Sequence, residues 1–464
     1  MPGIKRRRNR LDVIRVFERR EKVGGCWVQD PAHRSPQLPD FKTLASRTAD
    51  KPHDIPSSLP TYVPRSTQYR HDETSVYPLL ETNIDYHTME FSQEPIPVKQ
   101  TSRSIQRHGP STPFRHHTVV QQYSEGLLDR NGYKDFVECG VTVERVEKVN
   151  GSWKLTPRKS GAERDYWWAE EFDAVAVASG HYTVPHVPYI KGLEEFASAY
   201  PGSVEHSKGY RGAEKYRQKN VVVIRASVSG MDISRDLIGV AQHPINAVGR
   251  GKWHPYFGKS AFDHTDIKTR SAIKRIESTG GRRTIHFEDG SHIDNVDSII
   301  LGTGYSWTLP FLPDFPVTNN RLPGLYLHIF QRQDPTLAFV VAIAAGFTFK
   351  SLEWQAVLAA RYFAGRVELP PVAEQEKWET DRIAVKGDGV PFTALYPHFE
   401  EYFETVRNLA GEPAPGQPGR RLPKFGKGWR ELFDSGHQRR IEAWKKENEA
   451  RSGAGNSVAV KARL

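Results

Sequence analysis

Short apolar runs and helix-compatible segments alternate along the middle of the chain. Four consecutive apolar residues at Val221–Ile224 predict a buried strand, and a helix-compatible segment follows from Met231 to about Val240. A second apolar run at Ile245–Val248 comes next. The order of strand, small-residue turn, helix and strand is that of a βαβ unit with parallel strands. We therefore expect an α/β fold.

Other segments add strands and helices on both sides of this unit. Short apolar runs predict strands at Leu11–Glu18, Phe172–Ser179, Arg283–Phe287 and Ser298–Leu301. Alternating residues on both sides of Asn150-Gly151 predict a hairpin formed by Phe136–Val149 and Ser152–Pro157. Helices are predicted at Ser111–Leu128 and Leu352–Phe363, and a long loop from Pro31 to about Pro64.

Length and composition set the class of protein. With 464 residues, of which 38% are hydrophobic, the chain can form two domains, or one domain with a large insertion. The longest apolar stretch, Leu337–Phe349, is shorter than the ~20 residues that a membrane-spanning helix needs. The two cysteines, Cys26 and Cys139, lack the spacing of metal ligands or of a disulfide framework. We expect a cytoplasmic protein without a membrane span or metal site.

The net charge of +10 comes from the two ends of the chain. Basic residues are concentrated before Leu11 and after Gly416, whereas the region between these two residues is almost neutral. A nucleic-acid-binding protein is expected to carry a basic face on its folded body. Solvated basic tails therefore explain the charge better than a nucleic-acid partner, and nucleic-acid binding is the less favoured alternative.

Candidate chemistry begins at the turn after Val221–Ile224. A strand, a glycine-rich turn and a helix together present backbone N–H groups to a dinucleotide pyrophosphate. Here the turn contains Ser227, Ser229 and Gly230, with Arg225 at the position of the first glycine. Taken alone, this pattern also fits an ordinary strand-to-helix turn. Arg250 and Lys252 follow the next strand, where basic side chains suit the 2′-phosphate of NADPH.

A second nucleotide-binding unit is represented by its later half. Glu18 ends a predicted strand, where a carboxylate can bind ribose hydroxyls, and Gly24, Gly25 and Trp27 follow. The stretch from Met1 to Arg10 is too short, too charged and too poor in glycine to supply the preceding strand and glycine turn. We therefore expect a domain without its first strand and glycine turn.

Five motifs occur in an order that resembles the flavin-containing monooxygenases, particularly the fungal type. They are VFERREKVGGCW (16–27), LETN (80–83), YPGSVEHSKGY (200–210), ASVSG (226–230) and LGTGY (301–305). The third motif matches the fingerprint of the family at Gly202, His206 and Tyr210, with Tyr200 in place of Phe. Related Baeyer-Villiger enzymes have Trp at the last position, so Tyr210 favours the branch that oxygenates nitrogen and sulfur.

The resemblance implies a fold and an activity. The fold would be two Rossmann-like dinucleotide-binding domains, the NADP domain being inserted in a discontinuous FAD domain. The activity would be an FAD- and NADPH-dependent monooxygenase that uses O₂, through a C4a-hydroperoxyflavin, to oxygenate nitrogen or sulfur of small nucleophilic substrates. The implied boundaries are 11–184 and 296–410 for the FAD domain, 185–295 for the NADP domain and 411–464 for a basic C-terminal extension. The oligomeric state is left open.

The resemblance also assigns roles to individual residues. Asn83 would lie near the flavin and the nicotinamide as the catalytic residue, because its amide offers both a donor and an acceptor. Without the resemblance, an Asn bonded to its own backbone in a turn would explain it equally well. The remaining candidates would bind or support the cofactors: Glu18, Gly24, Gly25, Trp27, Ser179, Gly180, Gly202, His206, Ser227, Ser229, Gly230, Arg250, Gly302 and Gly304.

Two further departures from the family pattern favour an alternative function. Arg225 replaces a glycine at a turn where a side chain would meet the pyrophosphate. Asp85 stands where relatives often have Pro, and its charge would disturb a nearby flavin. The alternative is a non-catalytic remnant of the family with impaired binding of FAD and NADPH.

Overall fold

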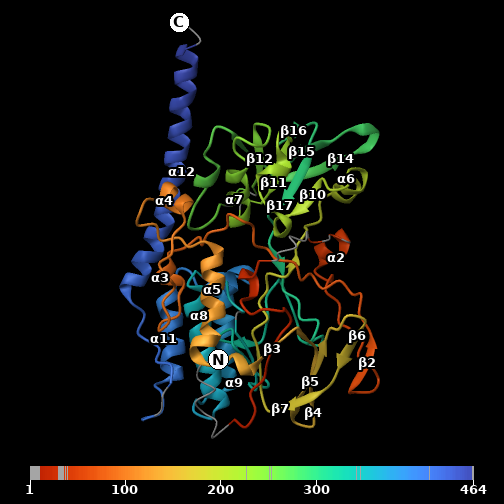
Figure 1. Cartoon of the computed structure of the whole chain (residues 1–464), viewed down its shortest axis with the longest axis vertical. Coiled ribbons are helices and arrows are strands. Elements are labelled where there is room, and N and C mark those ends of the chain that lie inside the picture. The colour runs from red at the N-terminus through yellow and green to blue at the C-terminus, as the bar shows by residue number, and fades with distance from the viewer. Residues whose placement is uncertain are drawn as a thin grey trace.

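The polypeptide forms two lobes that are connected along one side by a long helix (Figure 1). A computed structural model describes residues 11–29, 36, 38, 40–225, 227–249, 251, 253–340, 342–344, 346–416 and 419–461. The parallel-sheet lobe, at the top of Figure 1, contains the strands between residues 204 and 301. The mixed lobe, below it, contains most of the remaining helices and strands.

The parallel-sheet lobe is built on five parallel strands in the order β10-β17-β11-β12-β13. Their bounds are Val204–His206, Ser298–Leu301, Val221–Ile224, Ile245–Val248 and Ile267–Arg270. Both faces of the sheet are covered. Val221 and Val223 pack in one hydrophobic cluster with residues of helix α7 (Val228–Asp236), while Val222 and Ile224 pack in another with α6 (Leu193–Ala199). Burial on both faces explains why β11 has an unbroken apolar sequence.

The structure confirms the predicted strands of this lobe and corrects one detail. The strands at Val221–Ile224, Ile245–Val248 and Ser298–Leu301 have the predicted bounds. Helix α7 begins at Val228 rather than Met231, because the turn ends at Ser227. Strand β17 pairs with both β10 and β11, so the sheet extends to Leu301.

An antiparallel sheet and two crossing strands complete this part of the fold. The antiparallel sheet consists of β14 (Ile273–Glu277), β15 (Thr284–Phe287) and β16 (His292–Ile293). The crossing strands, β9 (Val184–Pro185) and β18 (Tyr305–Ser306), pair with each other where the chain passes between the lobes.

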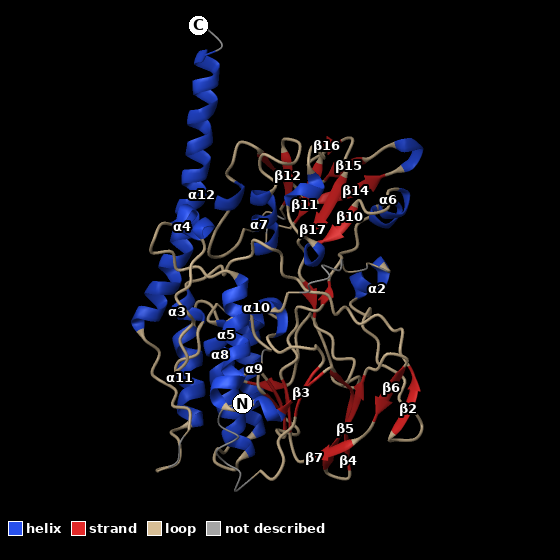
Figure 2. Cartoon of the chain, viewed as in Figure 1, coloured by secondary structure: helices blue, strands red, loops and turns tan. Residues whose placement is uncertain are grey.

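The mixed lobe carries most of its helices on one side and its strands on the other, with the short helix Phe41–Ser46 on the side of the strands (Figure 2). Its helices are α2 (Phe41–Ser46), α3 (Tyr86–Met89), α4 (Ser102–His108), α5 (His117–Asn131), α8 (Thr348–Phe363), α9 (Val372–Lys386), α10 (Val390–Thr393) and α11 (Phe399–Ala410). The predicted helices correspond to α5 and α8. Helices α5, α8 and α11 share a large hydrophobic cluster, in which Trp354, Phe399 and Phe403 are fully buried. No helix in the described ranges is both long and apolar enough to cross a bilayer.

The strands of the mixed lobe form several short sheets. Two parallel pairs carry sequence candidates at their carboxyl ends: β1 (Val16–Glu18) with β3 (Val137–Cys139), and β8 (Val175–Val177) with β21 (Leu337–Phe339). Strands β19 (Leu325–Tyr326) and β20 (Phe330–Gln331) extend the second pair. No strand in the part of the chain that the structure describes joins the two pairs.

A five-stranded antiparallel sheet closes the outer side of the mixed lobe. It contains β2 (Thr61–Pro64), β4 (Val141–Val149), β5 (Ser152–Lys159), β6 (Arg164–Trp167) and β7 (Glu170–Phe172). The predicted hairpin is confirmed as β4 and β5, because Asn150 (φ 48°) and Gly151 (φ 87°) form the tight turn between them.

The prediction of one long loop from Pro31 to Pro64 is wrong within the described residues. Asp40 accepts hydrogen bonds from the N–H groups of Lys42 and Thr43 and caps α2. Strand β2 pairs with β6, which lies far away in the sequence. Helix α2 depends on its cap, and β2 depends on its distant partner strand. Neither feature produces a regular hydrophobic pattern, so the sequence analysis missed both elements.

Candidate functional site

The carboxyl edge of the parallel sheet carries the start of helix α7. Ser227 has extended backbone angles, and the first hydrogen bond of the helix runs from the Met231 N–H to the Ser227 carbonyl at 2.9 Å. The N–H groups of Val228, Ser229 and Gly230 precede this bond, so the positive end of the helix lies here. Such an end attracts an anion.

Close backbone packing shapes this turn. A Cβ atom at Gly230 would lie 2.1 Å from the Arg225 carbonyl oxygen, and one at Gly302 would lie 3.2 Å from the Gly230 nitrogen. The Ser227 hydroxyl donates to the Gly302 carbonyl at 2.7 Å and therefore does not cap α7. The structure thus brings Ser227, Ser229, Gly230 and Gly302 together, and the tight backbone fits a dinucleotide pyrophosphate.

Arg225 adopts a backbone conformation that favours glycine. Its φ is +84°, and its Nη1 donates to the Thr303 carbonyl at 3.4 Å. A long side chain with positive φ is strained, by about 1–2 kcal/mol. The turn has therefore kept the backbone shape of the family pattern although its first glycine has been replaced.

A second guanidinium, missed by the sequence analysis, lies beside Arg225. Arg47 Nη1 donates to the Tyr305 carbonyl at 3.2 Å and to the Ser306 hydroxyl and the Asn320 side chain at 2.9 Å. Burial and the nearby charge of Arg225 lower the pKa of Arg47. No sequence pattern pointed to Arg47, whereas the predicted Arg250 and its neighbour Lys252 lie outside the described residues.

His206 of the fingerprint is buried in a fixed tautomer. Its Nδ1 accepts from the Lys208 N–H at 3.1 Å, so its Nε2–H donates to the Gly304 carbonyl at 2.9 Å. Complete burial lowers the pKa of His206 to about 3. Both ring nitrogens have partners, which suits a structural role better than proton transfer.

The structure separates Gly202 from these residues. His206 lies at the carboxyl end of β10, opposite Leu301, whereas Gly202 precedes the strand at its other end. Gly202 adopts a φ of +79° in the turn before β10. Since ligands of parallel sheets bind at the carboxyl edge, its position indicates a turn rather than a cofactor contact.

Aromatic rings connect the loop after β8 with the loop after β17. Ser179 and Gly180 follow β8, and the next residue, His181, stacks on Trp307 at 4.6 Å between ring centroids. Tyr182 lies 5.5 Å from Tyr305, which in turn lies 5.4 Å from His206. The structure therefore places the Gly180 and Gly304 loops side by side, next to the fingerprint.

Glu18 ends β1 in a compact turn. One of its carboxylate oxygens accepts from the Arg20 N–H at 2.8 Å, and the Arg20 side chain donates to the Gly25 carbonyl at 2.9 Å. Gly24 (φ 123°) and Gly25 (φ 56°) lead into a short 3₁₀ turn over Gly25–Trp27. Trp27 packs against the large hydrophobic cluster of the mixed lobe. These contacts hold the Glu18 carboxylate beside the glycine pair.

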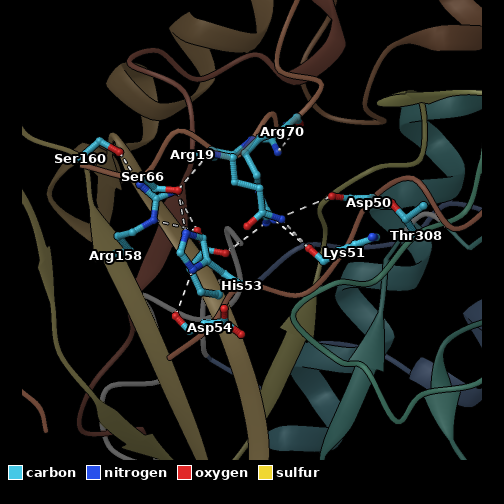
Figure 3. A network of polar contacts seen from close by, with 12 residues as sticks. Arg19, Asp50, Lys51, His53, Asp54, Ser66, Arg70, Arg158, Ser160 and Thr308 are labelled. Carbon is cyan, nitrogen blue, oxygen red and sulfur yellow. Dashed lines mark hydrogen bonds and ion pairs between the residues drawn. The ribbon is translucent and has the colours of Figure 1, made fainter. Parts of the chain in front are cut away.

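Arg19, the residue after Glu18, belongs to a network of polar contacts in the mixed lobe (Figure 3). Arg19 donates to the Arg70 carbonyl at 3.3 Å, and the Arg70 side chain binds Glu144 at 3.1 Å. Glu144 also pairs with Arg158 at 2.8 Å and is fully buried. Thr308 donates to Asp50, which lies 3.8 Å from Arg70. Three separate segments of the mixed lobe are thereby connected through Arg70.

Asn83 lies in a half-buried loop whose neighbours are firmly bonded. Thr82 accepts from the Arg115 N–H at 3.1 Å and donates to the Ile84 carbonyl at 3.1 Å. No group of the described residues hydrogen-bonds the Asn83 side chain. The amide is therefore not used to close its own turn, as a purely structural Asn would be.

Asp85, whose charge was expected to disturb a nearby flavin, is bonded at the start of helix α3. Its carboxylate accepts hydrogen bonds from the His87 N–H and from His87 Nδ1, both at 2.9 Å, and caps helix α3. A capping carboxylate is stabilised by the helix end that it serves. The departure from the family pattern at Asp85 is thus explained by local structure.

Comparison with known proteins identifies the family. The model of the family described as flavin-binding monooxygenase-like matches residues 72–256 and 263–388, more than half of the chain. The chain belongs to this family. A flavin-containing monooxygenase of Aspergillus flavus, ustF2, is 26% identical over 92% of both chains. The Arabidopsis thaliana enzyme FMO GS-OX5 is 31% identical over 82% of this chain and 73% of its own length.

Solved structures show the same fold. The S-allyl-L-cysteine S-oxygenase of Allium sativum superposes with a TM-score of 0.71 at 24% identity, covering 97% of this chain and 93% of its own. Cyclohexanone monooxygenase superposes with a TM-score of 0.54 at 11% identity, over 90% and 96% of the two chains. The expected α/β fold with two Rossmann-type domains is therefore confirmed, and the protein is an enzyme of the flavin-containing monooxygenase family.

One further residue of this monooxygenase was missed although a sequence signal existed. Lys208 stands inside the fingerprint, two residues after His206. Its buried ammonium donates to the carbonyls of His71 at 2.6 Å and Thr183 at 2.8 Å and pairs with Glu73 at 3.4 Å. Burial lowers the pKa of Lys208 to about 8. The position of this lysine inside the fingerprint was the sequence signal for a functional contact.

Proposed function

We propose that this chain is an FAD- and NADPH-dependent monooxygenase that oxygenates nitrogen or sulfur of small nucleophilic substrates. The observation that carries the proposal is the meeting of the Gly180 and Gly304 loops beside the fingerprint. Through these loops, the strand ends of the mixed lobe adjoin the α7 turn of the parallel-sheet lobe. An enzyme that passes electrons from one nucleotide to another needs this adjacency.

The residues present would bind the pyrophosphate of NADPH and a ribose of FAD. The N–H groups of Val228, Ser229 and Gly230 would hold the NADPH pyrophosphate at the positive end of α7, where the backbone packs so closely that a Cβ at Gly230 or Gly302 would clash with it. The Glu18 carboxylate would bind ribose hydroxyls of FAD, next to the left-handed turn at Gly24 and Gly25. The bound flavin supplies the oxygen-transfer chemistry, with NADPH as the reductant.

Asn83 would orient the reacting groups. Its side chain offers one acceptor and two donor hydrogens, and no described residue uses them. Because Thr82 and Ile84 are fixed by hydrogen bonding and burial, the amide would stay in one position during turnover. We assign Asn83 as the residue that contacts cofactor and substrate.

Relatives suggest the substrates to test. Similar proteins include a trimethylamine monooxygenase of Methylocella silvestris, 31% identical over 62% of both chains, and the S-oxygenase of Allium sativum. A tertiary amine and a thioether are therefore suitable probes. In each case one oxygen atom of O₂ would enter the product and the other would leave as water, using one NADPH and one proton.

The test starts from the purified full chain, reconstituted with FAD. We expect a bound yellow flavin, NADPH oxidation matched by O₂ uptake, and formation of trimethylamine N-oxide or of a sulfoxide. Asn83→Ala should lower kcat by more than tenfold, whereas Asn131→Ala, at the end of α5, should leave it unchanged. A chain that binds no flavin and oxidises no NADPH would overturn the proposal.

A second candidate, a non-catalytic remnant of the family, is favoured by one observation. Arg225 holds a strained, positive φ in the coenzyme turn and brings a cation to a position that is otherwise glycine. Weak NADPH binding that is restored by Arg225→Gly would support this alternative. Tight NADPH binding by the unchanged chain would refute it.

A further inference from the structure

The long helix α12 (Lys427–Lys461) contacts both lobes. Phe433 is fully buried in the core of the mixed lobe, where it stacks on Phe347 at 5.1 Å. Eleven residues later Trp444 is 1% exposed in the core of the parallel-sheet lobe, 5.4 Å from Phe257. Eleven residues are almost three whole turns, so the same face of α12 enters both cores.

Charged side chains of α12 hold helix α7. Arg440 pairs with Asp232 at 2.5 Å, and Glu447 pairs with Arg235. Asn448 accepts from Arg235 at 2.7 Å. The side chains of Arg440 and Arg235 are 8% and 4% exposed, so both guanidinium groups are shielded from solvent, whereas Glu447 is 38% exposed. The helix that begins with the coenzyme turn is thus bonded to α12 along its second half.

Between these two regions α12 touches the Asn83 loop. A Cβ at Gly436 would lie 3.1 Å from the Asp85 nitrogen, so the two backbones are in close contact. Asp85 is two residues after Asn83 and begins helix α3. On the adjoining turn of α12, Arg439 donates to the Ser111 carbonyl at 2.5 Å. A single rigid element therefore contacts the Asn83 loop and α7.

Other contacts between the lobes lie at the crossing and beside α7. The chain crosses at β9 and β18, which pair over two residues each, and Lys208 bridges nearby to His71 and Thr183. Tyr77 donates to Asp232 at 3.2 Å, and Tyr256 packs on Tyr396 at 4.6 Å. Helix α12 lies at a distance from this crossing, along the outer side of both lobes (Figure 1).

We propose that α12 is a positioning strap that fixes the α7 turn relative to the Asn83 loop. Arg440, with Asp232 as its partner, is its main positioning residue in the parallel-sheet lobe. The consequence for catalysis rests on the proposed function: NADPH on α7 would face Asn83 in one orientation only while the strap is bonded. The restraint itself is a property of the protein without ligands and is testable there.

The test compares two arginines of α12. Arg440→Met removes the charge that faces Asp232 but keeps an apolar chain against Phe257 and Trp444. Arg430→Met is the matched control, because among the described residues the hydrogen-bond, ion-pair and cation–π partners of Arg430 are Asp434, Pro397, Tyr396 and Phe399, none of which lies in the parallel-sheet lobe. Arg440→Lys keeps the charge, and Asp232→Asn removes the same pair from the α7 side.

Hydrogen exchange of the ligand-free protein gives the first measurement. We expect Arg440→Met and Asp232→Asn each to speed exchange in residues 228–236 and at the crossing by roughly tenfold, as for one shielded ion pair. Arg430→Met should leave these rates unchanged, and Arg440→Lys should largely restore them. Unchanged exchange rates in both Arg440→Met and Asp232→Asn, or faster exchange spread over the whole chain, would contradict the proposal that α12 restrains α7.

Steady-state kinetics give the second measurement. In Arg440→Met we expect kcat to fall about tenfold, with a KM for NADPH within about twofold of the parent value, since α7 keeps its turn but loses its orientation. An unchanged kcat together with faster local exchange would overturn the positioning role. If the parent chain itself shows no turnover, the proposed function fails, whereas the exchange result still decides whether α12 restrains the lobes.

Discussion

The two lobes hold their candidate residues by different means. In the parallel-sheet lobe, Ser229 and Gly230 follow a strand that is buried on both faces and bonded to neighbours on both sides. In the mixed lobe, Glu18 and Ser179 follow three-residue strands, and buried ion pairs around Arg70 and Glu144 connect the loops. Apolar packing of the sheet thus holds the candidate residues of the parallel-sheet lobe in position, and polar side-chain contacts hold those of the mixed lobe.

This difference predicts that the mixed lobe is the more sensitive to loss of a charge. Glu144→Gln would leave Arg70 and Arg158 buried without their shared carboxylate, at a cost of about 3–5 kcal/mol in the free energy of unfolding. Glu147→Gln, on the same strand but exposed, should cost less than about 0.5 kcal/mol. Urea denaturation measures both, and equal effects would show that the network does not stabilise the lobe.

The parallel-sheet lobe should instead be sensitive to added volume. Gly230→Ala would place a methyl group 2.1 Å from the Arg225 carbonyl, so we expect a loss of roughly 2–3 kcal/mol and weaker NADPH binding. Gly428→Ala, also near the start of a helix but with no atom within 4 Å, should gain up to about 1 kcal/mol. Thermal unfolding and NADPH titration distinguish the two, and a neutral Gly230→Ala would contradict the tight turn.

Acid should destabilise the fold through His206. Its folded-state pKa of about 3 lies below its unfolded value near 6.5. Between these two values the unfolded chain binds the extra proton and the folded chain does not, so stability falls as the pH falls. At pH 5 the loss is about 2 kcal/mol relative to pH 7. Unfolding at both pH values should show a smaller difference for His206→Gln than for the parent, and an equal difference would exclude His206 as the cause.

The smallest expected effect concerns the strained turn. Arg225→Gly should raise the free energy of unfolding by about 1 kcal/mol, because glycine adopts a positive φ without strain. Gln218→Gly relieves a similar φ of +58° outside the turn and is the control for stability alone. Calorimetry with NADPH should show tighter binding in the first variant only. Tighter binding in neither variant would mean that Arg225 does not oppose the coenzyme.

The contrast between the lobes also explains what the sequence could predict. The apolar run of β11 is continuous because both faces of the sheet are covered, and the bounds of β11, β12 and β17 followed from sequence alone. Arg47 and Arg70 gave no signal, since their partners are distant in the chain and are brought close only by the fold. The same holds for α2 and β2.

Within the site, the order of the motifs predicted which residues lie together better than the identity of single residues did. Gly230 and Gly302 lie together as the ordered motifs suggested, and no described residue hydrogen-bonds the Asn83 amide. Gly202 belongs to the same fingerprint but lies at the opposite end of β10, because a motif does not specify the direction of its strand relative to the ligand. Asp85 was expected to disturb the site. Its role as the cap of helix α3 could not be predicted, because it depends on a backbone turn that the sequence does not reveal.

The burial of Phe433 and Trp444 has a consequence for synthesis in the cell. Both lobes are translated before α12, yet each lacks one large aromatic side chain of its core until that helix arrives. A nascent chain released from the ribosome at residue 426 would present two apolar hollows, one lined by Phe347 and the other by Phe257, to chaperones and proteases. Premature stop codons near the 3′ end of the message should therefore be as damaging to protein yield as those in the middle.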